Sequence, residues 1–251
     1  MSPTGGFGMN TGIGDAVDLS WKLAGTLAGW GGDGLLDSYG PERRPVAERN
    51  VTEASGNLAR MLSPREHPPG PGLVEGSPEG DRLRRQVGEE FSNVIRREWH
   101  TLGIHLGYRY EGSPICSQDG TAAPPYEVMT YTPNARPGAR APHVWLADGT
   151  STLDLFGREF VLLRLGRDAP AGGSLVDAAA QRGVPLRLVS IDEAAVSELY
   201  GMALVLVRPD GHVAWRSDTE PAAAVAAAVV DIARGARAQA PALATQLEVA
   251  R

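Results

Sequence analysis

Residues 3–16 read Pro-Thr-Gly-Gly-Phe-Gly-Met-Asn-Thr-Gly-Ile-Gly-Asp-Ala, a glycine-rich start that passes into an apolar segment. The glycines predict a loop as far as Gly8, because glycine adopts backbone conformations that other residues avoid. Asn10 and Thr11 offer side-chain oxygens suited to helix capping. Apolar residues from Ile13 to Ala24 then predict a helix that ends at the glycines in positions 31, 32 and 34.

A glycine loop that leads into a helix N-terminus is a physically distinctive arrangement. It lets a ligand approach the backbone, and the helix presents unpaired N–H groups with about half a positive charge. Such a place suits a group that is, or becomes, negatively charged. From these residues alone, a glycine turn before an ordinary buried helix is an equal alternative. Asp15 and Asp18 are interpreted as acidic residues that favour the helix N-terminus.

The segments after this helix are predicted from apolar spacing and from proline and glycine. The solvated face of the second helix is expected to carry Arg43, Arg44, Glu48 and Arg49. The predicted order is a helix from about residue 41 to 62, a proline-rich loop or linker over 63–80, a helix over 81–102, and short extended segments and turns over 103–142.

The C-terminal part alternates short strands and helices. The order βαβα, then a hairpin, then a helix implies a mixed sheet with helices on both faces, and it resembles the thioredoxin fold. The hairpin is expected to turn at Pro209-Asp210-Gly211, where glycine can take a positive φ. The predicted elements are strands 160–165, 186–191, 203–208 and 213–216, and helices 175–182, 193–200 and 220–234.

Composition excludes several classes of partner. A net charge of −6 and a pI of about 5.4 give no general attraction for nucleic acid or anionic lipid, so neither is expected as a partner. The single cysteine, Cys116, excludes an intramolecular disulfide framework and is expected to pack in a loop or strand end. No apolar run approaches about 20 residues and no signal peptide is evident, so a cytoplasmic location is expected.

Metal and dithiol chemistry are also not expected. The C-terminal unit has no Cys-x-x-Cys, so a structural role is expected for it. No metal site is predicted, because four of the histidines lack metal-ligand spacing and are interpreted as surface or hydrogen-bonded structural residues: His100, His105, His143 and His212.

The segment from Pro3 to Ala16, continued by Trp21-Lys22-Leu23-Ala24, resembles the third flavin-binding segment of the class A FAD-dependent aromatic-ring monooxygenases, the family of para-hydroxybenzoate hydroxylase and phenol hydroxylase. The segment Leu35–Pro45 resembles the stretch that follows it in this family, where the Glu and Arg residues look structural. Pro137–His143, Asp148-Gly149 and Leu153–Gly157 resemble the entry to the family's thioredoxin-like C-terminal domain.

The resemblance implies a cofactor and a reaction. It implies that FAD is reduced by NAD(P)H and that O₂ is then used to hydroxylate a small aromatic substrate, phenolic or polyketide-like. Gly6 and Phe7 would line the surroundings of the flavin, and no residue is assigned as catalytic. The residues that the resemblance places against the flavin are Pro3, Gly5, Gly8, Met9 and Asn10.

The fold class expected is α/β, with an incomplete flavin-domain helical segment followed by a thioredoxin-like mixed-sheet domain. We expect residues 1–102 to be the C-terminal helical part of the FAD-binding domain, 103–142 a linker with extended segments, and 143–251 the thioredoxin-like domain. The family's Gly-x-Gly-x-x-Gly turn and Gly-Asp pair are not found in this sequence, so an N-terminal flavin-binding half is expected to be missing.

Two consequences and two alternatives follow from that expectation. The chain by itself is expected to bind FAD weakly or not at all, and the helix from Gly12 to Ala28 is expected to expose apolar surface. One alternative is a non-catalytic fragment or structural module that needs a separate flavin-binding half. The other is a thioredoxin-like oxidoreductase, which the lack of paired cysteines opposes.

Overall fold

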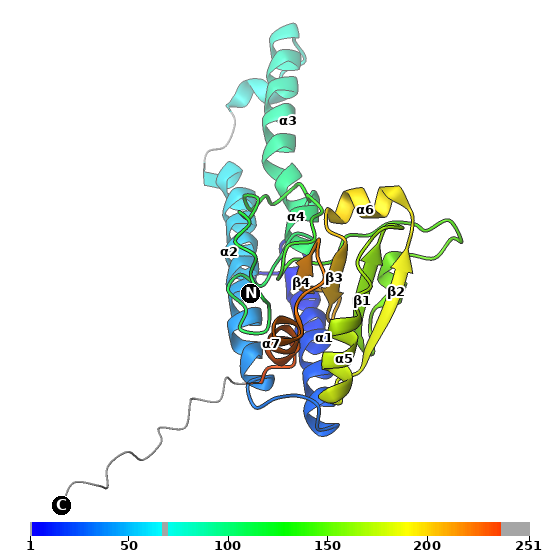
Figure 1. Ribbon diagram of the computed structural model, residues 1–251. Coiled ribbons are helices and arrows are strands. Elements are labelled where there is room, and N and C mark those ends of the chain that lie inside the picture. Colours follow the sequence, from blue (N-terminus) through cyan, green and yellow to red (C-terminus); the bar gives the residue numbers. More distant parts are fainter. Residues whose placement is uncertain (1, 67–69, 237–251) are drawn as a thin grey trace, which may run out of the picture.

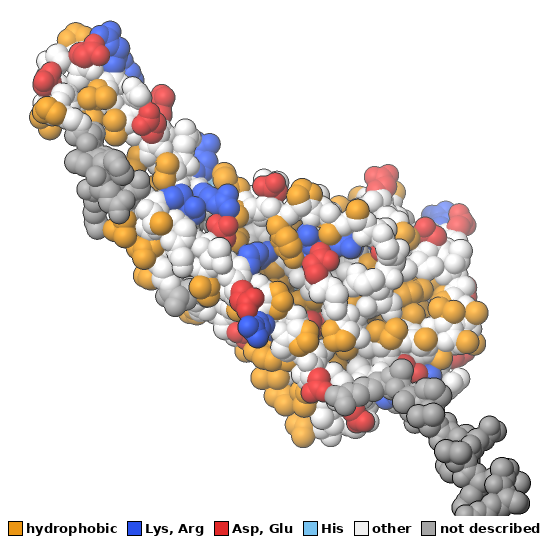
Figure 2. Space-filling view, turned by 90° about the vertical axis from the view of Figure 1, so that its left-hand side faces the viewer, with side chains coloured by type: hydrophobic (Ala, Val, Ile, Leu, Met, Phe, Trp, Pro, Cys, Tyr) orange, Lys and Arg blue, Asp and Glu red, His pale blue; other side chains and the backbone are white. Residues whose placement is uncertain are grey.

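The computed structural model describes residues 2–66 and 70–236. A helical part precedes a four-stranded sheet, and α3 (Pro78–Trp99) projects from the body as an arm beside the end of α2 (Tyr39–Glu66) (Figure 1). In Figure 2 the same arm stands clear of the body, with charged and hydrophobic side chains interspersed along it. None of the described helices combines the length and apolarity that crossing a membrane requires.

Helix α1 (Phe7–Leu27) begins earlier than the sequence predicted. Gly6 is its N-cap, in the left-handed region with φ 66°. The expectation that Asn10 or Thr11 caps the helix is therefore wrong. Both lie inside the helix and donate back to carbonyl oxygens one turn earlier, Asn10 to Gly6 and Thr11 to Phe7.

Helix α2 confirms the second predicted helix, but the prediction of its solvated face was partly wrong. Arg44 and Glu48 are exposed, as predicted, and form an ion pair with each other. Arg43, in contrast, is only 3% exposed, and Arg49 is partly buried, with Nη2 donating to the carbonyl of Ile104. A single sequence gives no sign of these long-range contacts, because arginines on a helix are ordinarily solvated.

The segment predicted as a loop over 63–80 is more helical than expected. Within it α2 runs on to Glu66, a short 3₁₀ turn covers Pro71–Val74 and α3 already begins at Pro78, while residues 67–69 lie outside the described part. Ser77 caps α3 by accepting the Gly80 N–H. Over 103–142, mostly without regular structure as expected, α4 (Leu102–His105) is a single turn of helix. Isolated bridges pair Arg109 with Ala139 and Arg140 with His212.

The C-terminal sheet has the predicted thioredoxin-like topology, with strand order β2-β1-β3-β4. Strand β1 pairs parallel with β2 and antiparallel with β3, and β3 pairs antiparallel with β4. Gly211 takes a φ of 79° in the hairpin turn, as expected. The elements are β1 (Phe160–Leu165), α5 (Gly173–Gln181), β2 (Leu186–Ile191), α6 (Ala194–Tyr200), β3 (Leu204–Val207), β4 (Val213–Ser217) and α7 (Ala223–Ala233).

Two apolar clusters cover the two faces of this sheet. Alternate residues of β1 enter different clusters, Phe160 and Leu162 into one and Val161 and Leu163 into the other. The first cluster includes residues of α5 and α7 together with Trp21 of α1, and the second includes residues of α6. Trp21 meets the ring of Phe160 edge-on, with 5.9 Å between centroids. The predicted domain boundaries stay a prediction, but α1 and the sheet share this core.

A buried ion cluster also joins the helical part to the sheet. Lys22 on α1 donates to Asp18 at 2.7 Å and to Glu42 of α2 at 2.6 Å. Arg208, at the end of β3, donates to Glu42 and Asp18 and through two nitrogens to Asp210. All five side chains are at most 1% exposed. The interpretation of Asp15 and Asp18 as helix-end charges is therefore wrong, because neither lies in the first turn of α1: Asp15 pairs with Arg43 and Asp18 is buried in the fourth turn.

We expect Glu42→Gln to destabilise the fold strongly. Glu42 accepts hydrogen bonds from both Lys22 and Arg208, so a neutral amide removes the carboxylate that these two buried cations share. Loss of one partner from a buried ion pair typically costs about 3–5 kcal/mol. Urea unfolding measures this cost. The control is Glu48→Gln on the exposed face of the same helix, which should leave the unfolding midpoint nearly unchanged; equal midpoints for both variants would contradict the role assigned to Glu42.

Candidate functional site

The glycine loop before α1 has a backbone that only glycine fits. Gly5 and Gly6 both have positive φ angles, 82° and 66°. A Cβ added to Gly5 would lie 2.8 Å from ring atoms of Phe7, closer than Cβ atoms approach other groups. Both the conformation and the space therefore require glycine at position 5.

Three helices hold this loop in place. Thr4 donates its hydroxyl to the carbonyl of Ala54 in α2 at 2.6 Å, and the N–H of Gly5 donates to a carboxylate oxygen of Glu98 in α3 at 3.1 Å. Phe7 is 1% exposed and packs with Ala54 and with Ile104 of α4. The backbone of the loop is thus fixed from behind, which preorganises it for a ligand on its open side.

The residues predicted to bind the flavin gather at the open N-terminus of α1. Pro3, Gly8 and Asn10 are exposed, Gly5 is partly buried, and Met9 is 76% exposed. No side chain caps the helix, so the N–H groups of its first turn have no capping partner. The structure brings the five predicted residues together, and whether they contact FAD stays a prediction.

The exposed face of α1 is apolar, as the sequence predicted for the helix from Gly12 to Ala28. Ile13 is 55% exposed and Val17 is 49% exposed, and with Met9 they follow at intervals of four residues along one side of the helix. Beyond them Leu23 is 42% exposed and Leu27 is 87% exposed. A row of this kind next to an uncapped N-terminus is a surface suited to association.

A cavity of about 330 Å³ lies beside this loop, between α1, α2 and α4. It has apolar and aromatic walls, including Phe7, Val46 and Tyr108, and polar groups from Asn50 and Arg43. Burial and the nearby Arg49 lower the pKa of His105, which also lines this space, so its imidazole is neutral at neutral pH.

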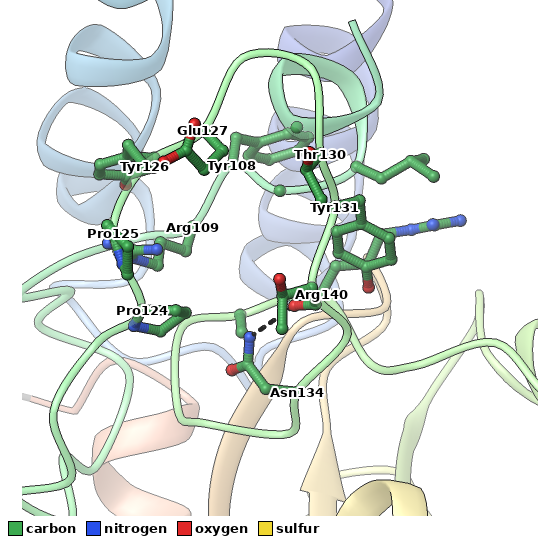
Figure 3. A pocket seen from close by; sticks show the side chains of 15 residues that line it. Tyr108, Arg109, Pro124, Pro125, Tyr126, Glu127, Thr130, Tyr131, Asn134 and Arg140 are labelled. Carbon is green, nitrogen blue, oxygen red and sulfur yellow. Dashed lines mark hydrogen bonds between the residues drawn. The ribbon is translucent and has the colours of Figure 1, made fainter.

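A second pocket is enclosed by the irregular segment 103–140 (Figure 3). Tyr126 and Tyr131 stand on opposite sides of it, and the guanidinium of Arg109 lies 3.8 Å from the centroid of the Tyr126 ring. Its free volume is about 30 Å³, which is about the space of one water molecule. The cavity beside the loop is the better candidate for an organic ligand.

Sequence reasoning missed the buried charges behind the loop. Lys22 is the only lysine in the chain and lies among apolar residues, a signal that could have marked it as buried. Burial, opposed by Lys22 and Arg208, raises the pKa of Asp18 to about 7.

Among the described residues no cluster of His, Cys, Asp or Glu is arranged to hold a metal ion. His212 was expected to be a surface or hydrogen-bonded residue; it is buried, and its ring packs against Tyr110 with 4.3 Å between centroids.

Comparison with known proteins matches both parts of the chain. Residues 1–54 match the family described as FAD binding domain, and residues 134–236 match the family described as aromatic-ring hydroxylase, C-terminal. Both parts of the chain are therefore similar to parts of the FAD-dependent aromatic-ring monooxygenases. This confirms the family that the glycine-loop segment predicted.

Curated relatives similar to the chain include one named as a polyketide hydroxylase and one named as an aklavinone hydroxylase. A putative polyketide hydroxylase of Streptomyces halstedii is 40% identical over 251 residues, which cover 88% of this chain and 40% of that protein. Aklavinone 12-hydroxylase RdmE of Streptomyces purpurascens is 37% identical over 230 residues, covering 86% of this chain and 38% of that protein. The chain thus spans about 40% of the length of these curated relatives.

Solved structures of the family superpose on the chain closely. The rebeccamycin biosynthetic enzyme RebC with reduced flavin has a TM-score of 0.82 and 48% identity, covering 94% of this chain and 43% of that one. The flavin-dependent monooxygenase PieE, in complex with FAD and substrate, has a TM-score of 0.76 and 32% identity, covering 92% and 45%.

We expect Gly5→Ala to destabilise the loop by about 1–3 kcal/mol, the usual cost of placing a side chain at a positive φ. The Cβ would also press on the buried Phe7 ring. Thermal unfolding measures the effect. Gly12→Ala is the matched control, because its Cβ meets nothing within 4 Å and alanine favours a helix interior, so it should be neutral or stabilising.

The raised pKa of Asp18 predicts a pH dependence of stability. Its folded-state pKa of about 7 lies above the ordinary 3.8, so the folded chain holds this proton more tightly than the unfolded chain does. The stabilisation is full below the ordinary value and is lost as the pH rises towards about 7, by at most about 1.4 kcal/mol per pH unit.

The variant Asp18→Asn isolates this effect, because it removes the titrating group and leaves Lys22 and Arg208 facing Glu42 and Asp210. Between about pH 5 and pH 8, the wild-type free energy of unfolding should fall relative to that of the variant. Since the lowered pKa of His105 acts on both proteins, the difference between them cancels it. Parallel curves for the two proteins would contradict the assignment.

Proposed function

We propose that this chain supplies the flavin-facing loop, the helix behind it and the thioredoxin-like domain of an FAD-dependent monooxygenase, which hydroxylates an aromatic substrate with NAD(P)H and O₂. The observation that carries the proposal is the uncapped N-terminus of α1 behind a strained glycine loop, in the part of the chain that matches the FAD binding domain family.

The residues present fit a flavin. The loop offers backbone that a planar ring can approach, since Gly5 and Gly6 carry no side chains, and Pro3, Gly8, Met9 and Asn10 lie on its open side. These five residues, Pro3, Gly5, Gly8, Met9 and Asn10, would hold the ring. The free N–H groups of α1 would stabilise negative charge on it. When bound, FAD would carry electrons from NAD(P)H and activate O₂ for transfer to the substrate.

Several finer points belong to the same proposal. The substrate would be a small phenolic or polyketide-like aromatic, as the names of the relatives suggest for those proteins. The apolar row of Met9, Ile13 and Val17 would pack against a flavin-binding half supplied outside the described residues. No nucleic acid or membrane partner is proposed, and a cytoplasmic location stays a prediction from composition. The thioredoxin-like domain would be structural.

A chimera tests the proposal directly. Residues 2–236 would replace the matching C-terminal part of RebC, whose 48% identity makes correct packing of the joined halves realistic. We expect the purified chimera to keep FAD through gel filtration and to oxidise NAD(P)H, whereas the chain alone keeps little FAD. Gly5→Ala in the chimera should weaken FAD binding about tenfold, equivalent to about 1.4 kcal/mol of loop strain.

The chimera experiment has one control variant and two outcomes that would contradict the proposal or its expectation for the chain alone. Glu48→Gln, on the exposed face of α2, should leave the affinity of the chimera for FAD unchanged. A folded chimera that holds no FAD would favour the alternative of a non-catalytic module. A stoichiometric flavin spectrum from the chain alone would show instead that the loop and α1 suffice for cofactor binding.

A further inference from the structure

A third cavity, of about 390 Å³, lies between α2 and the irregular segment that follows α4. Pro41, Pro45 and Val46 of α2 and the ring of Tyr126 give it largely apolar walls. Its volume is in the range of sites for small organic molecules, which is roughly 300–1,000 Å³. It shares only Val46 with the cavity beside the glycine loop, so the two are separate spaces.

Arg49 is a partly buried cation at this cavity that makes no ion pair with a described residue. Its Nη2 donates to the carbonyl of Ile104 at 2.8 Å, whereas its Nε is buried and has no acceptor. The charge of Glu53 acts on Arg49, but this carboxylate is already paired with Arg97 at 2.8 Å. Since a guanidinium keeps its proton, burying it without a counter-ion costs free energy that a bound anion would recover.

A second guanidinium lies beside the first. The Cζ of Arg109 lies 3.8 Å from the centroid of the Tyr126 ring, and that of Arg49 lies 5.1 Å from it. Figure 3 shows the side chains of Arg109 and Tyr126 next to each other. Burial lowers the pKa of Arg49, and the charge of Arg109 lowers it further. Two cations that repel each other on one part of a cavity wall favour an anion between them.

Two carboxylates also line this cavity, and both are engaged elsewhere. Glu42 belongs to the buried ion cluster, where two cations hold it. Glu111 accepts from Nε of Arg109 and lies 3.7 Å from Nη1 of Arg136, so two cations share this one carboxylate. The wall therefore keeps a surplus of positive charge, carried by Arg49 and by the terminal nitrogens of Arg109, which donate to no described residue.

We propose that this cavity binds a small organic anion through its oxyanion group, a carboxylate or a phosphate, which accepts hydrogen bonds from Arg49 and Arg109. The planar guanidinium matches the geometry of both oxyanions. The prolines of α2 and the Tyr126 ring pack against the body of the ligand. The site needs neither FAD nor the aromatic substrate of the proposed reaction, so it is tested independently of the proposed function.

Cyclohexanecarboxylate and cyclohexanecarboxamide are the matched probes, because they share a ring and differ in the charge of the group that the arginines bind. Cyclohexyl phosphate is the third probe and distinguishes a phosphate ester from a carboxylic acid as the preferred ligand. Ligand-observed NMR titration of the whole chain without added FAD gives all three affinities. We expect the preferred anion to bind about tenfold more tightly than the amide, since hydrogen bonds between charged groups are roughly twice as strong as neutral ones.

Variants of one residue separate the charge from the cavity. Arg49→Met removes the charge and keeps a long unbranched side chain, so it should bring the affinity for the preferred anion down to that for the amide. Arg49→Lys keeps a positive charge and should give an intermediate affinity. The control is Arg44→Met, which removes the same charge from the exposed face of α2, where the Arg44 side chain is 81% exposed, and should alter none of the three affinities.

Three results would overturn the proposal. The first is equal affinity of the wild-type chain for the amide and both anions, and the second is a preference for an anion that persists in Arg49→Met. The third is an equal loss of that preference in Arg44→Met, because net charge and not the cavity would then attract the anion. If Arg49→Met does not fold, Arg109→Met removes the other cation and carries the same expectation. Retention of FAD, measured separately, does not enter into any of these outcomes.

Discussion

The bridge from Arg208 to Glu42 and Asp18 is the interaction on which the arrangement of the helical part depends. It joins α1 and α2 to the hairpin of the sheet, and none of its members reaches solvent. Buried charges are tolerated only where each is matched closely by partners, so the cluster admits little displacement of α1. The direction of α1, and with it the position of its uncapped N-terminus beside the glycine loop, is set by this cluster and by the Trp21 packing next to it.

The cluster contains unequal numbers of carboxylates and cations. Asp18, Glu42 and Asp210 supply three carboxylates against the two cations of Lys22 and Arg208. Burial disfavours an unmatched negative charge, so one of the three carboxyls is expected to keep a proton. The pKa of Asp18 is raised, whereas those of Glu42 and Asp210 are lowered because Arg208 binds both closely. The cluster is thus close to neutral by holding a proton at Asp18.

The sequence predicted the sheet far better than it predicted the surroundings of the loop. Strand β1 begins and ends where its apolar run does, because burial on both faces leaves a nearly continuous apolar signal, whereas β2 is mostly exposed and was located by its alternation of apolar and polar residues. The five loop residues were found through a local motif, and they do lie together. The start of α1 was missed because two consecutive glycines hid a left-handed cap. Arg43, Asp18 and Asn50 were missed because their partners are remote in the chain, and a single sequence does not show such pairings.

The separation between Asp18 and Arg208 is 190 residues, and this has a consequence for biosynthesis. On the ribosome, α1 emerges 190 residues before the arginine that pairs with its buried Asp18. Until then α1 cannot dock, because Asp18 and Lys22 would enter the core incompletely matched. Helix α1 is therefore made well before it can reach its final environment, and its apolar row stays available to chaperones in the meantime.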